Sequence, residues 1–335
     1  MKGLALGSAA AVLIALAVGV AVLVSGGDGH SPAALDPRAA SPTSSATAPA
    51  AVPTPTPPPA GGSDPVLVGA GDIADCGSSG AAGSGAEATA KLLDGIAGTV
   101  FTAGDNAYGS GTTRQFANCY NPTWGRHKIR TYPAAGNHDY LTPGASGYYD
   151  YFGAAAGDHS KGYYSYNLGA WHVIVLNTND LCSKIRCDSG SPQEQWLRTD
   201  LADHPAKCTL AYWHHPRYSS GITHGSSTEV SALYKALYDY NADLIITGHE
   251  HNYERFAPQD ANGNLDAARG IRQFVVGTGG AHHYGFVSTP VSHSEVRNSD
   301  TFGVIKLTLH SGSYDWKFVP EAGKTFTDSG SQACH

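Results

Sequence analysis

Residues 66–76, VLVGAGDIADC, open the folded part of this 335-residue chain and set its pattern. A mostly apolar run ends in a Gly-Asp pair, as expected where a buried strand gives way to a loop. Residues 99–109, TVFTAGDNAYG, show the same order, and a stretch with helical apolar spacing lies between them near residues 87–93. This alternation of strand, helix and strand predicts a layered α/β fold.

Further apolar segments extend this pattern toward the C-terminus. Their apolar residues are spaced as in buried strands or as on one face of a helix. In chain order we expect a short strand leading to Gly136, strands within residues 171–179 and 209–216, a helix over 228–240 and a strand at 242–247. We expect residues 272–277 and 303–320 to be antiparallel strands that close a second sheet.

The N-terminal part of the chain differs in composition from the rest. Lys2 precedes an almost unbroken apolar stretch at residues 4–24, so residues 1–27 are expected to be a cleaved secretory signal or an uncleaved signal anchor. Residues 28–64 are rich in Pro, Ala, Ser and Thr, which is typical of a semi-extended linker. This leaves residues 65–335 as one folded domain, exported under either interpretation.

The charge distribution argues against nucleic acid as a partner. The formal net charge is -7, only 15% of the residues are charged, and no run of Lys or Arg is present. A protein that follows a phosphate backbone needs such a basic patch. We therefore expect no nucleic-acid binding patch.

Six cysteines all lie in the predicted domain, at positions 76, 119, 182, 187, 208 and 334. An even number of cysteines suits an oxidising compartment. The sequence contains no CxxC pair, which argues against a structural zinc site. Six cysteines allow fifteen pairings. Our preferred pairing joins Cys182 to Cys187, Cys76 to Cys119 and Cys208 to Cys334.

Five polar clusters stand where predicted strands stop and loops begin, the positions at which α/β sheets collect ligands. One Gly-Asp pair after a strand is usually a turn, but carboxylate, phenol, amide and imidazole groups together suit two cations bridged by one carboxylate. The clusters are GDIADC with Asp72, GDNAY with Asp105 and Tyr108, GNHD with Asn137, His138 and Asp139, WHHP with His214 and His215, and GHEH with His249 and His251.

These clusters resemble the five ordered motifs of the calcineurin-like metallophosphoesterases, and specifically those of the purple acid phosphatases, from residue 66 to about residue 320. The specific mark is Gly-Asp-x-x-Tyr with Tyr108, because relatives outside the purple acid phosphatases carry a histidine two residues after the first aspartate. Ala74 occupies that position here. The resemblance implies a metallophosphoesterase-type β-sandwich of two mixed sheets flanked by helices, in α/β/β/α layers.

The resemblance also implies which residues hold two metal ions. His214 rather than His215 is expected to be a ligand, because the family pattern is His-x-Pro and Pro216 lies two residues after His214. The implied ligands are Asp72, Tyr108 and His251 for an iron(III), Asn137, His214 and His249 for a second ion that is Fe(II), Zn or Mn, and Asp105 as the bridge between them.

Three further histidines are candidates for catalysis. Attack on phosphorus by a metal-activated hydroxide requires a proton donor for the leaving oxygen, and His138, beside Asn137, is our first candidate. His224 resembles in position a histidine that faces substrate in the family, with an exposed loop histidine as the alternative. His215 either contacts substrate or supports the ligands from behind, and we favour the supporting role.

The function that the resemblance implies is an exported, metal-dependent hydrolase of small-molecule phosphate monoesters, secreted or anchored at the outer face of the cell membrane by the N-terminal segment. A phosphodiesterase acting on nucleotides or lipid head groups with the same metal centre is an alternative, because loop shape decides that choice. A non-catalytic surface binding module is a third hypothesis. The sequence does not specify an oligomeric state.

Overall fold

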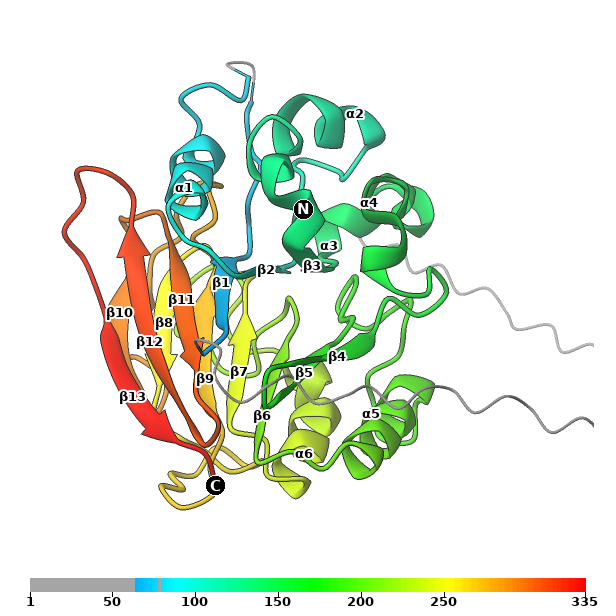
Figure 1. Cartoon of the computed structure of the whole chain (residues 1–335), viewed down its shortest axis with the longest axis vertical. Helices are drawn as coiled ribbons and strands as arrows, with labels where there is room; N and C mark the ends of the chain where they lie inside the picture. Colours follow the sequence, from blue (N-terminus) through cyan, green and yellow to red (C-terminus); the bar gives the residue numbers. More distant parts are fainter. Residues whose placement is uncertain (1–63, 78–79) are drawn as a thin grey trace, which may run out of the picture. The chain divides into compact units, whose positions relative to one another are not determined.

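The computed structural model describes residues 64–77 and 80–335. Two β-sheets pack against each other, with helices on the outer sides (Figure 1). This arrangement confirms the expected sandwich of two mixed sheets flanked by helices. The predicted signal or anchor, and all of the linker except Asp64, lie outside the described residues. Within the described part of the chain, no helix is long and apolar enough to cross a membrane.

The first sheet has six strands in the order β13-β12-β11-β1-β2-β3. Its β1, β2 and β3 are parallel to one another, whereas β11 pairs antiparallel with β1 and is followed by two antiparallel neighbours. The strands are β1 (Val66–Ala70), β2 (Thr99–Ala103), β3 (Thr131–Ala134), β11 (Gly303–Leu309), β12 (Ser313–Pro320) and β13 (Ser329–Ala333).

The second sheet has seven strands in the order β10-β8-β9-β7-β6-β5-β4. Four central strands are parallel, and antiparallel strands complete both sides. The strands are β4 (Tyr164–Leu168), β5 (Trp171–Val175), β6 (Cys208–Tyr212), β7 (Leu244–Thr247), β8 (Tyr253–Phe256), β9 (Arg272–Val276) and β10 (Ser294–Asn298).

The expected grouping of the C-terminal strands was wrong in one respect. Residues 303–320 do form the antiparallel pair β11 and β12, but this pair extends the first sheet beside β1. Residues 272–276 form β9, which lies in the other sheet and is parallel to β7. An apolar run predicts that a strand is buried, but its partner is chosen by contacts far away in the sequence.

Three helices cover the two sheets, and a serine caps the N-terminus of two of them. Ser84 and Ser191 each accept a hydrogen bond from the backbone N–H three residues later, which satisfies one of the free donors of α1 and α5. The longer helices are α1 (Gly85–Asp94), α5 (Pro192–Asp203) and α6 (Ser231–Asp239). The shorter ones are α2 (Thr113–Gln115), α3 (Asn137–Tyr140), α4 (Ser146–Phe152), η1 (Phe116–Tyr120), η2 (Trp124–Arg130), η3 (Pro143–Ala145), η4 (Gly153–Ala156) and η5 (Thr228–Val230).

Two hydrophobic clusters hold these layers together. The larger one fills the space between the sheets and continues under α1, where Ala86, Ala90 and Leu93 are buried. The second lies between the seven-stranded sheet and the pair α5 and α6, and includes Leu197 and Leu233. Central strands of the seven-stranded sheet are buried on both faces, so β5, β6 and β7 are close to continuously apolar.

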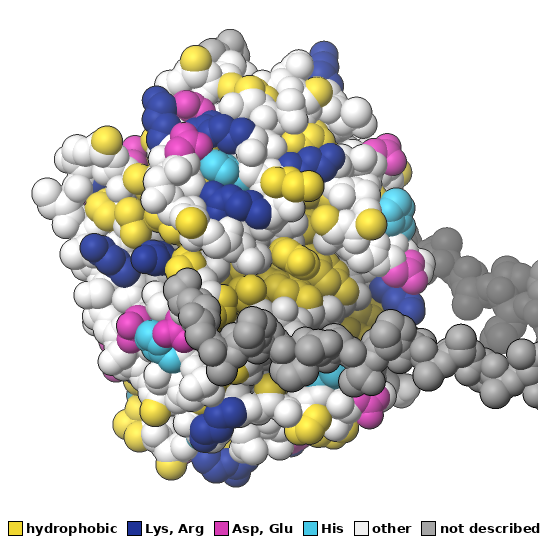
Figure 2. Space-filling view, viewed as in Figure 1, with side chains coloured by type: hydrophobic (Ala, Val, Ile, Leu, Met, Phe, Trp, Pro, Cys, Tyr) yellow, Lys and Arg dark blue, Asp and Glu magenta, His cyan; other side chains and the backbone are white. Residues whose placement is uncertain are grey.

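The strands β3 and β4 are the edges of their respective sheets, and aromatic side chains connect them. Tyr132 of β3 stacks on Tyr166 of β4 with ring centroids 4.1 Å apart. Tyr148 and Tyr164 both donate their hydroxyls to the carbonyl of Pro133. Hydrophobic side chains gather across the middle of the face shown in Figure 2. These tyrosine side chains therefore pack the two sheet edges together.

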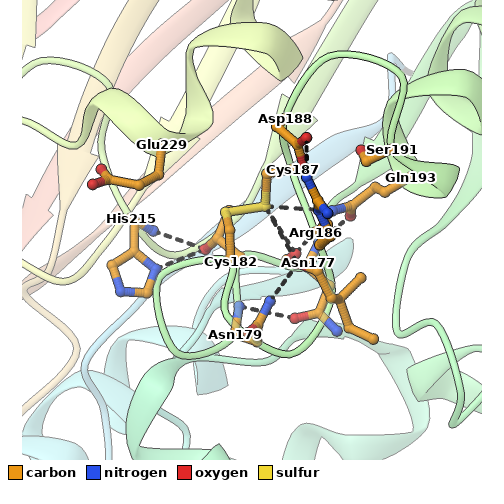
Figure 3. Close-up of a disulfide and its surroundings, with 12 residues drawn as sticks. Asn177, Asn179, Cys182, Arg186, Cys187, Asp188, Ser191, Gln193, His215 and Glu229 are labelled. Carbon is orange, nitrogen blue, oxygen red and sulfur yellow. Dashed lines mark hydrogen bonds and ion pairs between the residues drawn. A yellow bond between two sulfur atoms is a disulfide. The ribbon is translucent and has the colours of Figure 1, made fainter. Parts of the chain in front are cut away.

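All three disulfides of the preferred pairing are present. Cys76 bonds to Cys119, Cys182 to Cys187, and Cys208 to Cys334. The Cys182–Cys187 bond closes a short loop between β5 and α5, and His215 lies beside this loop (Figure 3). Cys208 begins β6 and Cys334 directly follows β13, so their bond joins the two sheets covalently.

We expect this last bond to stabilise the fold most. Chain-entropy estimates give about 5 kcal/mol for a loop that closes 126 residues and about 2 kcal/mol for one that closes five. Replacing Cys208 and Cys334 by alanine should therefore lower the free energy of unfolding more than replacing Cys182 and Cys187. Denaturant titration of both double variants measures the difference, and equal losses would contradict the expectation.

Candidate metal centre

The carboxyl ends of five parallel strands, three from one sheet and two from the other, carry the five polar clusters. Backbone hydrogen bonds connect these ends directly. The Asp72 N–H donates to the Gly104 carbonyl at 3.0 Å, and the Gly248 N–H donates to the His214 carbonyl at 2.9 Å. Gly71 donates to Val276 of the other sheet at 2.9 Å. The clusters therefore meet at a single edge of the sandwich.

Three residues of the clusters have a left-handed backbone that non-glycine residues rarely adopt. The φ angles are 60° at Asp72, 51° at Asp105 and 70° at His249. Such conformations cost free energy and persist mainly where the surrounding structure needs the side chain in one direction. Gly104 also has a positive φ, and a Cβ on it would lie 2.5 Å from the His214 ring. Each turn thus aims a polar group at the same point.

One half of the cluster is centred on the hydroxyl of Tyr108. This oxygen lies 2.9 Å from Asp72 Oδ1 and 3.0 Å from His251 Nε2. Asp72 Oδ1 is 3.3 Å from the same histidine nitrogen. The three residues expected around iron(III) therefore bring their ligand atoms together.

The other half is centred on His214 Nε2. This nitrogen lies 3.0 Å from Asn137 Oδ1 and 3.1 Å from His249 Nδ1. Asp105 Oδ2 lies 3.3 Å from His214 Nε2 and also 3.0 Å from the Tyr108 hydroxyl. All seven predicted ligands are thus in one cluster, and the Asp105 carboxylate contacts both halves.

The ligand atoms face one another with more lone pairs than protons. Carbonyl oxygens of Ala103 and His282 lie 2.9 and 2.6 Å from the Nδ1 atoms of His214 and His251 and can accept their protons. In these tautomers both Nε2 atoms turn a lone pair toward carboxylate, amide or imidazole acceptors. Metal-ligating histidines are usually oriented in this way. A cation bound between these groups would accept their lone pairs, so the residues present fit a metal centre.

The electrostatics of the protein alone point the same way. Burial disfavours a charged His214, but Asp105 and Asp72 outweigh this effect and raise its pKa to about 9. Burial and the same two carboxylates raise the pKa of the Tyr108 phenol well above its usual value. Burial, followed by the neighbouring imidazoles, lowers the pKa of His249 well below 6.5. The cluster therefore attracts positive charge, while His249 stays neutral.

Of the three candidate catalytic histidines, His138 contacts the Asp105 carboxylate. Its Nδ1 atom is 2.7 Å from the Gly109 carbonyl, and its Nε2 atom is 3.9 Å from Asp105 Oδ2. Its backbone N–H donates to the other Asp105 oxygen at 2.8 Å. The imidazole is partly exposed, so His138 has one nitrogen available beside the cluster.

The other two histidines pack on His249. The His224 ring stacks on His249 with centroids 4.1 Å apart, and the His215 ring lies 4.2 Å from it. His215 is buried and its Nδ1 atom is 2.8 Å from the Thr178 hydroxyl. The supporting role favoured for His215 is consistent with this contact.

Among the supporting residues, Asp139 belongs to a polar cluster of the sequence and Tyr284 does not. The Asp139 carboxylate accepts hydrogen bonds from the N–H groups of Asn106 and Gly136 and thereby holds the loop. Tyr284 stacks on His251 at 4.1 Å and lies 5.7 Å from the His224 ring. No motif includes Tyr284, so the pattern of the sequence offered nothing to identify it.

A second group of histidine and aspartate side chains lies elsewhere, on β5 and α5. His172 Nε2 is 2.8 Å from Asp200 Oδ2, and the His172 and His204 rings are nearly parallel, at 13°, with centroids 4.9 Å apart. Imidazole lone pairs lie in the ring plane, so two stacked parallel rings cannot both point at one ion. Convergence of lone pairs therefore distinguishes the cluster around Asp105 from this group.

Comparison with known proteins agrees with the fold. The sequence model of the calcineurin-like phosphoesterases matches residues 64–253, more than half of the chain. The chain belongs to the calcineurin-like phosphoesterase family. The chain is 35% identical to purple acid phosphatase 15 of Arabidopsis thaliana over 130 residues, which make up 37% of the chain and 23% of that protein. It thus matches about a quarter of the length of this relative.

Solved structures show the same fold at low sequence identity. The purple acid phosphatase PPD1 from yellow lupin superposes with a TM-score of 0.63 and 21% identity, covering 83% of this chain and 55% of the lupin chain. GAP50, described as the anchor in the inner membrane complex of Plasmodium, superposes with a TM-score of 0.59 and 17% identity, covering 82% and 90% of the two chains. One fold thus occurs in proteins described in quite different terms.

Asp139 should be important for the shape of the site. Replacing it with alanine leaves buried donors of Asn106 and Gly136 without their acceptor, and we expect the free energy of unfolding to fall by about 2–4 kcal/mol. Chemical denaturation measures this change. Asp150→Ala removes an exposed carboxylate and serves as the control. If the two variants were equally stable, Asp139 would not anchor the loop.

Proposed function

We propose that this chain is an exported binuclear-metal phosphoesterase that hydrolyses phosphate monoesters of small molecules. The observation that carries the proposal is the shared Asp105 carboxylate, which contacts Tyr108 in one half of the cluster and His214 in the other. A carboxylate in this position suits a bridge between two cations. Membership of the calcineurin-like phosphoesterase family supports the same chemistry.

The proposed ligand sets differ in chemical character. Asp72, Tyr108 and His251 combine a carboxylate, a phenol and an imidazole, which suits iron(III). Asn137, His214 and His249 offer only neutral ligand atoms once His214 has lost its proton, which suits a divalent ion such as Fe(II), Zn or Mn. Two bound cations would neutralise the charge of a phosphoryl group and lower the pKa of a coordinated water.

His138 is the proposed donor of the proton that the leaving oxygen requires. The Gly109 carbonyl holds its Nδ1 atom, so the imidazole keeps one orientation, with Nε2 on the side of Asp105. A positioned histidine of this kind contributes general acid catalysis. His224, which stacks on His249, is the proposed contact for the phosphoryl oxygens, and His215, which packs on the same ring, is the proposed support for His249.

Three disulfides and the apolar N-terminal stretch support export, because disulfides persist in oxidising compartments. Secretion and anchoring at the outer face of the membrane both agree with these features. Phosphodiesterase activity remains the second candidate function, since the metal centre is suited to both kinds of ester. A binding module without catalysis is the third, and the resemblance of the fold to GAP50 keeps it open.

The proposed iron site predicts a coloured protein. Tyrosinate bound to iron(III) gives a charge-transfer band in the visible spectrum, and the Tyr108→Phe variant should lose this band. Absorption spectra with metal analysis of the same samples, which should contain two ions per chain, provide the test. A colourless, iron-free protein that still hydrolyses phosphate esters would disprove the iron assignment and leave the phosphoesterase standing.

The substrate class can be measured directly. We expect turnover of 4-nitrophenyl phosphate to exceed that of bis(4-nitrophenyl) phosphate at equal concentration, and His138→Ala to lower kcat by roughly 100-fold through loss of general acid catalysis. The Asp150→Ala variant, which changes an exposed residue, is the control for effects of preparing a variant protein. Dominant turnover of the diester would reverse the preference, and metal-loaded protein without turnover of either ester would favour the binding module.

A further inference from the structure

The side chain of Glu250 connects a distant loop to the turn that carries two proposed ligands. Glu250 stands between His249 and His251 and is fully buried. Its Oε1 atom accepts hydrogen bonds from the backbone N–H groups of His224 at 2.5 Å and Gly225 at 2.6 Å. One carboxylate oxygen thus holds two consecutive residues that lie about 25 positions earlier in the chain.

The loop also packs closely against this carboxylate at Gly221. A Cβ placed on Gly221 would lie 2.1 Å from Glu250 Cδ and 2.2 Å from Oε2. A second carboxylate, Glu254, accepts from the Ser220 N–H at 2.7 Å and thereby holds the start of the same loop. Residues 220–225, which we term the His224 loop, are therefore fixed at both ends by two glutamates.

The position of the His224 imidazole depends on this attachment. Among the described residues, none forms a hydrogen bond with the ring nitrogens of His224, whereas its backbone N–H is held by Glu250. The ring nevertheless stacks on His249 with centroids 4.1 Å apart and planes 29° apart. Backbone anchoring by Glu250 accounts for this placement, since it fixes the Cα from which the side chain extends.

We propose that Glu250 is a positioning residue that holds His224 over the second metal site, where the imidazole contacts the phosphoryl group of the substrate. This inference rests on the proposed function and names a residue outside its ligand set. The carboxylate acts through two backbone hydrogen bonds and does not touch the substrate. Its effect on phosphate binding should therefore pass through His224 alone.

The test is a double-mutant cycle of Glu250 and His224. Glu250→Met keeps a long side chain but removes the acceptor, and Glu250→Gln keeps an oxygen that can accept both bonds. We expect Glu250→Met to raise KM and to weaken the binding of inorganic phosphate, measured by calorimetry, by about tenfold, the effect of one lost charge-assisted hydrogen bond. Glu250→Gln should restore most of the affinity, and exposed Glu229→Gln should behave as wild type.

The decisive comparison uses the His224→Ala background. There Glu250→Met should cause no further loss of phosphate affinity, because the side chain that it positions is absent. Metal content and the visible spectrum should match those of the wild-type protein in every variant. If the losses were additive, or if Glu250→Met lost metal, the carboxylate would support the ligands and the proposed role of Glu250 would be wrong.

Two further results complete the design. If Glu250→Met does not fold, Gly221→Ala provides the same test. The Cβ added at position 221 would displace the Glu250 carboxylate without removing Glu250 itself. A wild-type protein that holds two metals but neither binds phosphate nor hydrolyses esters would overturn the proposed function, and the role of Glu250 with it. Normal wild-type behaviour with additive losses would overturn only the role of Glu250.

Discussion

The buried Oδ2 atom of Asp105 accepts a hydrogen bond from the Tyr108 hydroxyl at 3.0 Å and lies 3.3 Å from His214 Nε2. The lone pair of that nitrogen repels the carboxylate unless a proton or a cation lies between them. Burial makes the repulsion stronger, because the low dielectric around the cluster screens it little. With no cation, the protein can offer only protons, and the pKa of His214 is raised accordingly. The fold must therefore hold together groups that would otherwise separate.

Rigid parts of the structure provide this restraint. The strands that end at the cluster are hydrogen-bonded within and between the two sheets, and the left-handed turns at Asp72, Asp105 and His249 follow these strands immediately. Backbone carbonyls fix the imidazoles of His214 and His251, and Thr178 does the same for His215. A site whose supports are mostly backbone atoms tolerates change in the side chains around it, which suits a fold shared at 21% identity.

The loops above this rigid base contribute groups that the strands do not. His224 and Tyr284 come from separate loops, yet each stacks on a different proposed ligand, His249 and His251. The base defines where a phosphoryl group would lie, and the loops define what can lie beside it. This division explains how one fold can occur both in the lupin phosphatase and in the protein described as an anchor in Plasmodium.

The sequence by itself determined the layered fold class, the cysteine pairing that we preferred, and the seven residues that meet at one edge. The fold class followed from local patterns, since a polar cluster directly after an apolar strand identifies both the strand and its carboxyl end. The seven residues followed from the resemblance of these clusters to a known family, and the cysteine pairing was a preference among fifteen. Tertiary structure alone decided that β9 and β11 belong to different sheets, that Thr178 is the partner of His215, and that Glu250 holds the His224 loop. These contacts join residues between 25 and about 240 positions apart, and a local pattern records that a group is buried but not which distant backbone or side chain it meets.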